Sequence, residues 1–353
     1  MAEYSIEQLL LAAKENKASD LHVTVGVPPK IRKNGKLVSL PLAEVTPEDV
    51  RSLINTMLLE PYSQQLKEKG EVDFSWESDS VGRVRVNILK QKGNYAFVSR
   101  LINDAPPLPE AIGLPESVVN LTRKKRGLVL VTGPTGSGKS TTLASLINEI
   151  NVRQHAHIIT LEDPIEYVHP HKQSIVNQRE IGSDTLNYTA ALRAALREDP
   201  DVILVGEMRD LDTIATAITA AETGHLVFST LHTIGAANTI DRVIDVFPPH
   251  QQQQIRIQLA SVLEAVISQQ LLPLQDGKGR VAAFEIMYAN NAIRNLIREG
   301  KTHQIESIMQ TGRKLGMQTM DDAIYELYLK RKIDSDTALD FAVDPYILEK
   351  KLY

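Results

Sequence analysis

The chain contains no cysteine among its 353 residues. This absence excludes disulfide bonds, zinc sites built from thiolates and cysteine nucleophiles. No apolar run approaches the ~20 residues that a membrane-spanning helix needs, so we expect no direct membrane insertion. The first residues, MAEYSIEQLLLAAKEN, are acidic and lack a small-residue cleavage site, which argues against a signal peptide. These absences favour a cytoplasmic protein that reaches a membrane only through a partner.

Neither sign of charge is in large excess. The net charge is −5, and the contents of 42% hydrophobic and 24% charged residues are typical of a soluble globular protein. Without a basic excess, nucleic acid is not expected as a partner. A length of 353 residues exceeds what one hydrophobic core usually supports, so two domains are expected.

Residues 1–104 predict a small α+β domain with an antiparallel sheet. An amphipathic helix is expected over residues 5–17, a hairpin turn at Asn34-Gly35 and a helix with Thr46 as its N-cap. Residues 105–120 concentrate prolines, which predicts a semi-rigid linker. A loop inside a single domain is the alternative.

Residues 121–353 change to apolar strands that alternate with helices. The strands are expected within GLVLVTG, HIITLED, DVILVGE and HLVFSTLH. Because these runs are apolar throughout, both faces of the sheet should be covered, which predicts a mainly parallel α/β sheet. Further on, a helix is expected with Leu259, Val262, Leu263 and Val266 on one stripe, and only helices are expected after AAFEIM.

The stretch GPTGSGKST fits the phosphate-loop pattern G-x-x-x-x-G-K-[ST], and it lies between a predicted strand and a predicted helix. Backbone N–H groups of such a loop converge on phosphate oxygens, and the helix N-terminus adds its positive dipole. Lys139 is expected to reach the β- and γ-phosphates of ATP, and the Ser140 hydroxyl to ligate Mg²⁺. The predicted nucleotide-binding residues are Gly133, Pro134, Thr135, Gly136, Ser137, Gly138, Lys139, Ser140 and Thr141.

Carboxylates follow two other predicted strands. Glu162 and Asp163 end one strand, Glu166 follows Pro164, and Glu207 follows the other strand after Gly206. The carboxyl ends of parallel strands share one edge, so these acids should face the phosphate loop. We expect Glu207 to face the attacking water and Glu162 to support the metal shell. For Asp163 and Glu166, a role as surface acids is the equal alternative.

Two histidines flank the strand within GHLVFSTLHT. His225 precedes it and His232 follows it, and seven residues of extended chain separate the two by ~20 Å. His232 is expected at the nucleotide edge, where an imidazole can donate to the γ-phosphate. His225 is expected to meet a neighbouring subunit or the other edge of the sheet.

Four stretches together resemble the Walker A, Asp box, Walker B and His box of secretion ATPases: GPTGSGKSTT, ITLEDPIEY, ALREDPDVILVGEMRD and TGHLVFSTLHT. The resemblance implies a RecA-like P-loop NTPase domain preceded by a PAS-like domain, in a hexameric, Mg²⁺-dependent ATPase motor. Two features of the chain are similar to the motors that retract type IV pili and power twitching motility. The chain lacks a four-cysteine zinc insert, and it contains the segment AIRNLIREGKTHQIESIMQTG.

The resemblance also implies site residues and partners. Arg85 and Arg100 match arginines that reach the active site from the N-terminal domain, with Arg83 as a competing candidate. The implied partners are identical subunits in a homo-hexamer, an inner-membrane pilus platform protein and other pilus ATPases. The implied location is cytoplasmic, peripheral to the inner membrane. A paralogous pilus motor, a DNA-transport motor and a nucleotide-gated assembly protein with little turnover are the alternatives.

Overall fold

The structure, a computed structural model, describes residues 4–60, 62–102 and 105–352. It divides into two compact units, one of Met1–Ala105 with Glu166–Val168 and one of Pro106–Ile165 with His169–Tyr353. Residues 103 and 104, which end the first predicted domain, lie outside the described residues. Within the described ranges, no helix combines the length and the apolar character that crossing a membrane requires.

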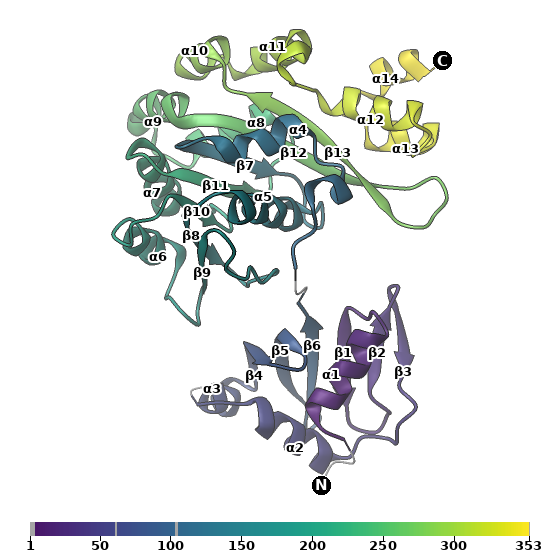
Figure 1. Ribbon diagram of the computed structural model, residues 1–353. Coiled ribbons are helices and arrows are strands. Elements are labelled where there is room, and N and C mark those ends of the chain that lie inside the picture. The colour runs from purple at the N-terminus through teal and green to yellow at the C-terminus, as the bar shows by residue number, and fades with distance from the viewer. Residues whose placement is uncertain (1–3, 61, 103–104, 353) are drawn as a thin grey trace. The chain divides into compact units, whose positions relative to one another are not determined.

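Among its described residues, the first unit has a six-stranded antiparallel sheet and three helices (Figure 1). The strand order is β3-β2-β1-β6-β5-β4. Its elements are α1 (Ile6–Glu15), β1 (Asp20–Thr24), β2 (Lys30–Lys33), β3 (Lys36–Ser39), α2 (Pro47–Met57), α3 (Tyr62–Lys69), β4 (Glu71–Ser78), β5 (Gly82–Gln91) and β6 (Asn94–Leu101).

Local sequence signals explain most of this unit. Thr46 caps α2 and Asp49 completes the capping box, which satisfies N–H groups that would otherwise lack partners. The predicted turn between β2 and β3 has Asn34 and Gly35 at positive φ, as a tight hairpin requires. The helix expected over residues 5–17 is α1, which buries Ile6, Leu9, Leu10 and Ala13.

The second unit is built on a seven-stranded sheet of order β13-β12-β7-β11-β10-β8-β9. Every pairing is parallel except β12 with β13, which is antiparallel. The strands are β7 (Gly127–Thr132), β8 (His157–Glu162), β9 (Ile175–Glu180), β10 (Val202–Val205), β11 (Leu226–Leu231), β12 (Leu263–Pro273) and β13 (Arg280–Tyr288).

Helices cover both faces of this sheet. The α-helices of the unit are α4 (Glu116–Val119), α5 (Lys139–Arg153), α6 (Tyr188–Ala195), α7 (Leu211–Glu222), α8 (Ala236–Asp245), α9 (Pro249–Val262), α10 (Asn291–Glu299), α11 (Ile305–Thr311), α12 (Met320–Leu329), α13 (Ser335–Phe341) and α14 (Pro345–Leu352). Short 3-10 helices are η1 (Pro109–Ile112), η2 (Asn120–Arg123), η3 (Thr302–Gln304) and η4 (Arg313–Leu315).

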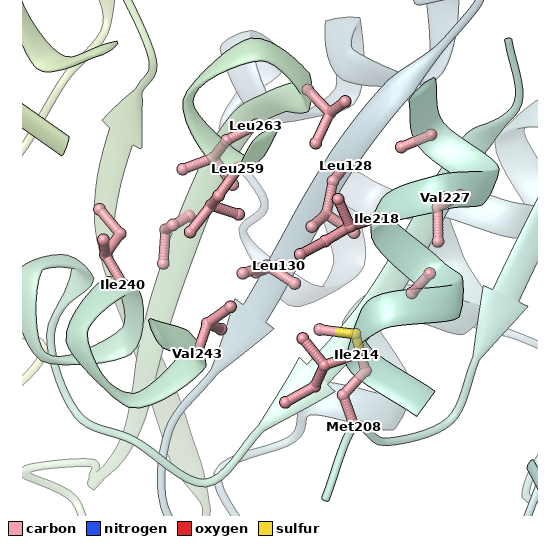
Figure 2. Close-up of a cluster of buried hydrophobic side chains, with 14 of the residues drawn as sticks. Leu128, Leu130, Met208, Ile214, Ile218, Val227, Ile240, Val243, Leu259 and Leu263 are labelled. Atoms are coloured by element: carbon pink, nitrogen blue, oxygen red, sulfur yellow. The ribbon is translucent and has the colours of Figure 1, made fainter. Parts of the chain in front are cut away.

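Strand β7 shows how the two faces are filled. Leu128 and Leu130 pack with α7, α8 and α9 on one face, as Figure 2 shows. Val129 and Val131 pack with α5 on the other face. Since side chains of a strand alternate between faces, a wholly apolar strand is the one that two helical layers can bury.

Two expectations about local structure were wrong. Residues 109–112 and 116–119, assigned to a linker, form η1 and α4, and Leu114 and Val118 of this stretch are buried in the core of the second unit. The helical stripe expected to run on to Val266 ends with α9 at Val262, where β12 begins. Pairing of β12 with β7 inside the sheet overrides the helical spacing of its apolar residues.

Candidate functional site

The phosphate loop connects β7 to α5. Gly133 follows β7 directly, and Gly138 caps α5 in the left-handed region with φ of 90°. A Cβ atom at Gly133 would lie 2.2 Å from the carbonyl oxygen of Gln269, so only glycine fits there. Pro134, Thr135 and Gly136 form the exposed tip of the loop.

Lys139 is buried at the start of α5. Its Nζ donates hydrogen bonds to the carbonyl oxygens of Gly133 at 2.9 Å and Pro134 at 3.0 Å. The ammonium group therefore lies within the curve of the loop. Ser140 and Thr141 follow in the first turn of α5, where the unpaired N–H groups and the helix dipole favour an anion.

Gln269 of β12 supports the phosphate loop through side-chain hydrogen bonds. Its side chain is 2% exposed, accepts a hydrogen bond from Thr142 Oγ1 at 2.8 Å and donates one to the carbonyl oxygen of Ser137. One buried amide thus joins the loop to the first turn of α5. Sequence reasoning missed Gln269, although a polar pair inside the apolar stretch AVISQQLL was a signal.

Glu207 and His232 lie at the ends of the neighbouring strands β10 and β11. Oε2 of Glu207 is 3.3 Å from Nε2 of His232, and its Oε1 is 2.6 Å from Nε of Arg209. The carboxylate is thereby held through both oxygens. The sequence singled out Glu207 and His232 separately, and it missed Arg209.

Glu162 ends β8, the strand next to β10. Its Oε1 accepts hydrogen bonds from Thr160 Oγ1 at 2.6 Å and from Gln178 Nε2 at 3.1 Å. The parallel order of β7, β11, β10 and β8 places the phosphate loop, His232, Glu207 and Glu162 at one edge of the sheet.

Gly206 separates β10 from Glu207, and space explains its identity. Its φ is outside the left-handed region, but a Cβ atom would lie 2.8 Å from the Tyr188 hydroxyl and 3.1 Å from the carbonyl oxygen of Leu161. An aspartate, the residue common at this place in nucleotide hydrolases, would therefore collide with Tyr188. The absence of an aspartate at position 206 was visible in the sequence, but the presence of Tyr188 in the space beside it was not.

Tyr188 borders a cavity of about 600 Å³ beside Glu207. Burial, and then the charges of Glu207, Asp163 and Glu162, raise the pKa of the Tyr188 phenol well above its usual range. The phenol consequently stays neutral at physiological pH. The cavity is lined by Asp163, Ile181, Asn187, Tyr188, Thr189, Ala190, Arg193, Glu207, Arg209, Asp210 and Asp212.

Other predicted residues lie elsewhere. Glu166 is exposed and is not part of this cavity. His225 lies at the amino end of β11, where its Nδ1 is 2.9 Å from the carbonyl oxygen of Ala220 at the end of α7. Arg85 and Arg100 are on β5 and β6 of the first unit, each bonded to an aspartate of that unit.

The donor set suits a metal that is held jointly with phosphates. Within the described residues, no group of three or more histidine, aspartate and glutamate side chains could hold a metal ion by itself. The Ser140 hydroxyl beside the loop and the Glu162 carboxylate are the oxygen donors that Mg²⁺ prefers, and Mg²⁺ commonly combines few protein ligands with substrate phosphates and water.

Comparisons with known proteins agree with this geometry. The family described as "Type II/IV secretion system protein" matches residues 2–333. The type IV pilus retractation ATPase PilT of Pseudomonas aeruginosa is 48% identical over 340 residues, which cover 96% of this chain and 98% of PilT. A twitching motility protein of Neisseria gonorrhoeae is 48% identical over 335 residues, covering 95% of this chain and 90% of that protein.

A solved structure shares the fold over the whole length. The crystal structure of the pilus retraction motor PilT with bound ADP matches with a TM-score of 0.93 and 50% identity, covering 99% of this chain and 100% of that one. The predicted fold class, a mainly parallel α/β domain preceded by a small α+β domain, is confirmed. So is the resemblance to secretion ATPases: this chain belongs to the family of type II/IV secretion system proteins.

Proposed function

We propose that this protein is an ATP-hydrolysing hexameric motor that powers the retraction of type IV pili and hence twitching motility. The observation that carries the proposal is the joint placement of the phosphate loop, Glu207 and His232 at one sheet edge, in a chain that is 48% identical over nearly its full length to a retraction ATPase. Identical subunits and an inner-membrane platform protein are the proposed partners, and the proposed location is cytoplasmic, at that membrane.

The residues divide the chemistry between them. The N–H groups of the loop and Lys139 bind the phosphates of ATP. Mg²⁺, held by Ser140 and supported by Glu162, would neutralise charge on the β- and γ-phosphates. Glu207 positions the attacking water and accepts its proton. Arg209 and His232 keep the Glu207 carboxylate in place, and His232 is the group that can report loss of the γ-phosphate.

Steady-state phosphate release, measured beside nucleotide binding, tests the enzyme activity. Lys139→Ala should lose affinity for ATP, because the substitution removes the charge that holds the β- and γ-phosphates. Glu207→Gln should bind ATP normally and lose ~10²-fold or more in turnover, as expected when a general base is removed. A wild-type chain that binds ATP without releasing phosphate would instead be a nucleotide-gated assembly protein.

Retraction is tested in cells that have pili but lack their retraction motor. The wild-type chain should restore twitching, and Glu207→Gln should not, although both assemble. Restoration by neither, with phosphate release intact in vitro, would place the motor in another secretion or DNA-transport system of the same class.

A further inference from the structure

A short segment, His232–Gly235, connects the sheet to α8, and we call it the His232 segment. Its last residue is fixed by β12, because the N–H of Gly235 donates to Ser268 Oγ at 3.0 Å. The next N–H, that of Ala236 at the start of α8, donates to Oε1 of Glu285 on β13 at 2.6 Å. Strand β11 thus fixes the beginning of the His232 segment, and Ser268 and Glu285 fix its end.

Strand register brings these contacts close to the phosphate loop. Ser268 is paired with Glu285 across β12 and β13, and with Thr132, the last residue before the loop, across β12 and β7. Gln269, the next residue of β12, points to the opposite face and holds Ser137 of the loop. Two consecutive residues thus anchor the phosphate loop and the His232 segment.

Glu285 also lies beside the start of a second helix, α12. The next residue of β13, Ile286, exchanges two backbone hydrogen bonds with Gln318, two residues before α12. The N–H of Met320, the first residue of α12, acts on the Glu285 carboxylate and lowers its pKa. First-turn N–H groups have no partner within their own helix, and their dipoles favour a negative charge. Burial raises the pKa of Glu285, and the N–H groups of Ala236 and Met320 act against that effect. The same carboxylate therefore lies at the N-termini of both α8 and α12.

We propose that Glu285 is a positioning residue of the ATPase site, which holds the His232 segment against the sheet and couples its position to the C-terminal helix α12. The proposal rests on the function proposed above. A displacement of His232 that follows loss of the γ-phosphate would pass through Ala236 and Glu285 to Met320. A purely local helix-capping role would stabilise α8 and α12 without linking α12 to nucleotide.

Glu285→Gln separates the two possibilities. A carboxylate accepts with both oxygens, whereas a primary amide accepts with one and donates with its nitrogen, so one of the two N–H donors loses its acceptor. We expect kcat to fall about tenfold or more while the KM for ATP changes less than about threefold, because the phosphate loop is untouched. Nucleotide should alter amide hydrogen exchange of residues 320–329 in the wild-type chain and not in Glu285→Gln.

Two further variants complete the test. Ser268→Ala removes the acceptor of Gly235 and leaves Glu285 in place, so kcat should fall while α12 still responds to nucleotide. Asp322→Asn is the control at the same end of α12, because Asp322 accepts a hydrogen bond from Thr319, the N-cap of that helix, and its other partners are Arg313 and Lys351 rather than Glu285. Asp322→Asn should keep the wild-type kcat even if α12 exchanges faster.

The outcomes are distinguishable. Folded Glu285→Gln with wild-type kcat and a responding α12 would overturn the proposal, as would equal losses of kcat in Glu285→Gln and Asp322→Asn. If Glu285→Gln does not fold, Ser268→Ala with wild-type kcat would overturn the positioning role. Absence of phosphate release by the wild-type chain would overturn the proposed function, and the exchange comparison would still decide the link to α12.

Discussion

Arg85 and Arg100 lie directly opposite each other across β5 and β6. Each is paired with a different acid: Arg85 donates two hydrogen bonds to Asp73, and Arg100 donates one to Asp20. The Arg100 side chain is 69% exposed and that of Arg85 is 39% exposed. Arg100 is therefore the more accessible of the two to another anion, which makes it the better candidate for an arginine that completes an ATPase site.

The first prediction is that Arg100→Ala lowers turnover by ~10³-fold or more without changing ATP affinity, since an arginine supplied to a γ-phosphate stabilises the transition state by about this much. Arg85→Ala is the matched control and should have the smaller effect. Phosphate release and nucleotide binding measure the two quantities. A larger loss of turnover in Arg85→Ala would show that Arg85, and not Arg100, completes the ATPase site.

Mixed rings decide whether the arginine acts between subunits. Arg100→Ala and Glu207→Gln chains should each be inactive, and co-assembled rings should recover part of the activity, because some interfaces then hold both intact halves. No recovery in rings shown to contain both variants would confine Arg100 to its own chain.

The second prediction concerns the two histidines at opposite ends of β11. His232→Ala should lower kcat by ~10-fold or more and leave ATP binding intact, because the substitution removes a partner of Glu207. His225→Ala should leave kcat unchanged and lower the yield of assembled rings. Turnover assays and size-exclusion chromatography measure these effects. Similar losses of turnover in both variants would contradict this separation of roles.

The third prediction follows from the contact between Gly206 and Tyr188. Gly206→Ala should destabilise the protein by about 1–3 kcal/mol, because the added methyl group overlaps the Tyr188 hydroxyl. Tyr188→Phe removes that oxygen, so the double variant should recover part of the loss. Denaturant unfolding of the four proteins gives the coupling energy, expected to be at least about 0.5 kcal/mol.

Tyr188→Phe alone is the control in that cycle. If the effects of the two substitutions simply add, the tyrosine hydroxyl does not determine the need for glycine, and the Leu161 carbonyl oxygen at 3.1 Å would account for it.

The fourth prediction is a loss of stability in mild acid caused by His169. Its side chain is 5% exposed, and burial, followed by the charge of Lys172, lowers the pKa of the ring to about 4. The unfolded chain binds a proton near the usual pKa of about 6.5 while the folded protein does not, so stability falls as pH falls from that value toward 4.

The expected contribution at pH 5 is about 2 kcal/mol. Unfolding free energies at pH 7 and pH 5, compared between the wild-type chain and His169→Gln, isolate it: the wild-type chain should lose more. Equal losses in the two proteins would show that the pKa of His169 is not depressed.

Sequence patterns predicted the parts of the site that depend on local chemistry. The phosphate loop needs glycines and a lysine at fixed spacing, and Glu207 and His232 stand where apolar strands end. Parallel strand ends share an edge, so the neighbouring positions of these residues followed from the fold class.

Contacts between distant segments could not be predicted in the same way. Gln269 lies more than a hundred residues beyond the loop that it supports, and Tyr188 belongs to a helix that precedes β10. Such contacts depend on strand order and register, which periodicity does not specify. The same cause explains the error at β12, where the apolar spacing suited a helix and the neighbouring β7 decided otherwise.

The alternation of Ser268 and Gln269 also restricts how the length of this chain can vary. Adding or deleting one residue within β12 would turn every following side chain to the other face of the sheet, and both anchors would be lost together. The turn between β12 and β13 carries no such constraint, and residues 275–279 are exposed. A reporter peptide or a fluorophore could be inserted there to follow the C-terminal part of the motor during turnover. A single-residue insertion a few positions earlier, within β12, would instead inactivate the motor.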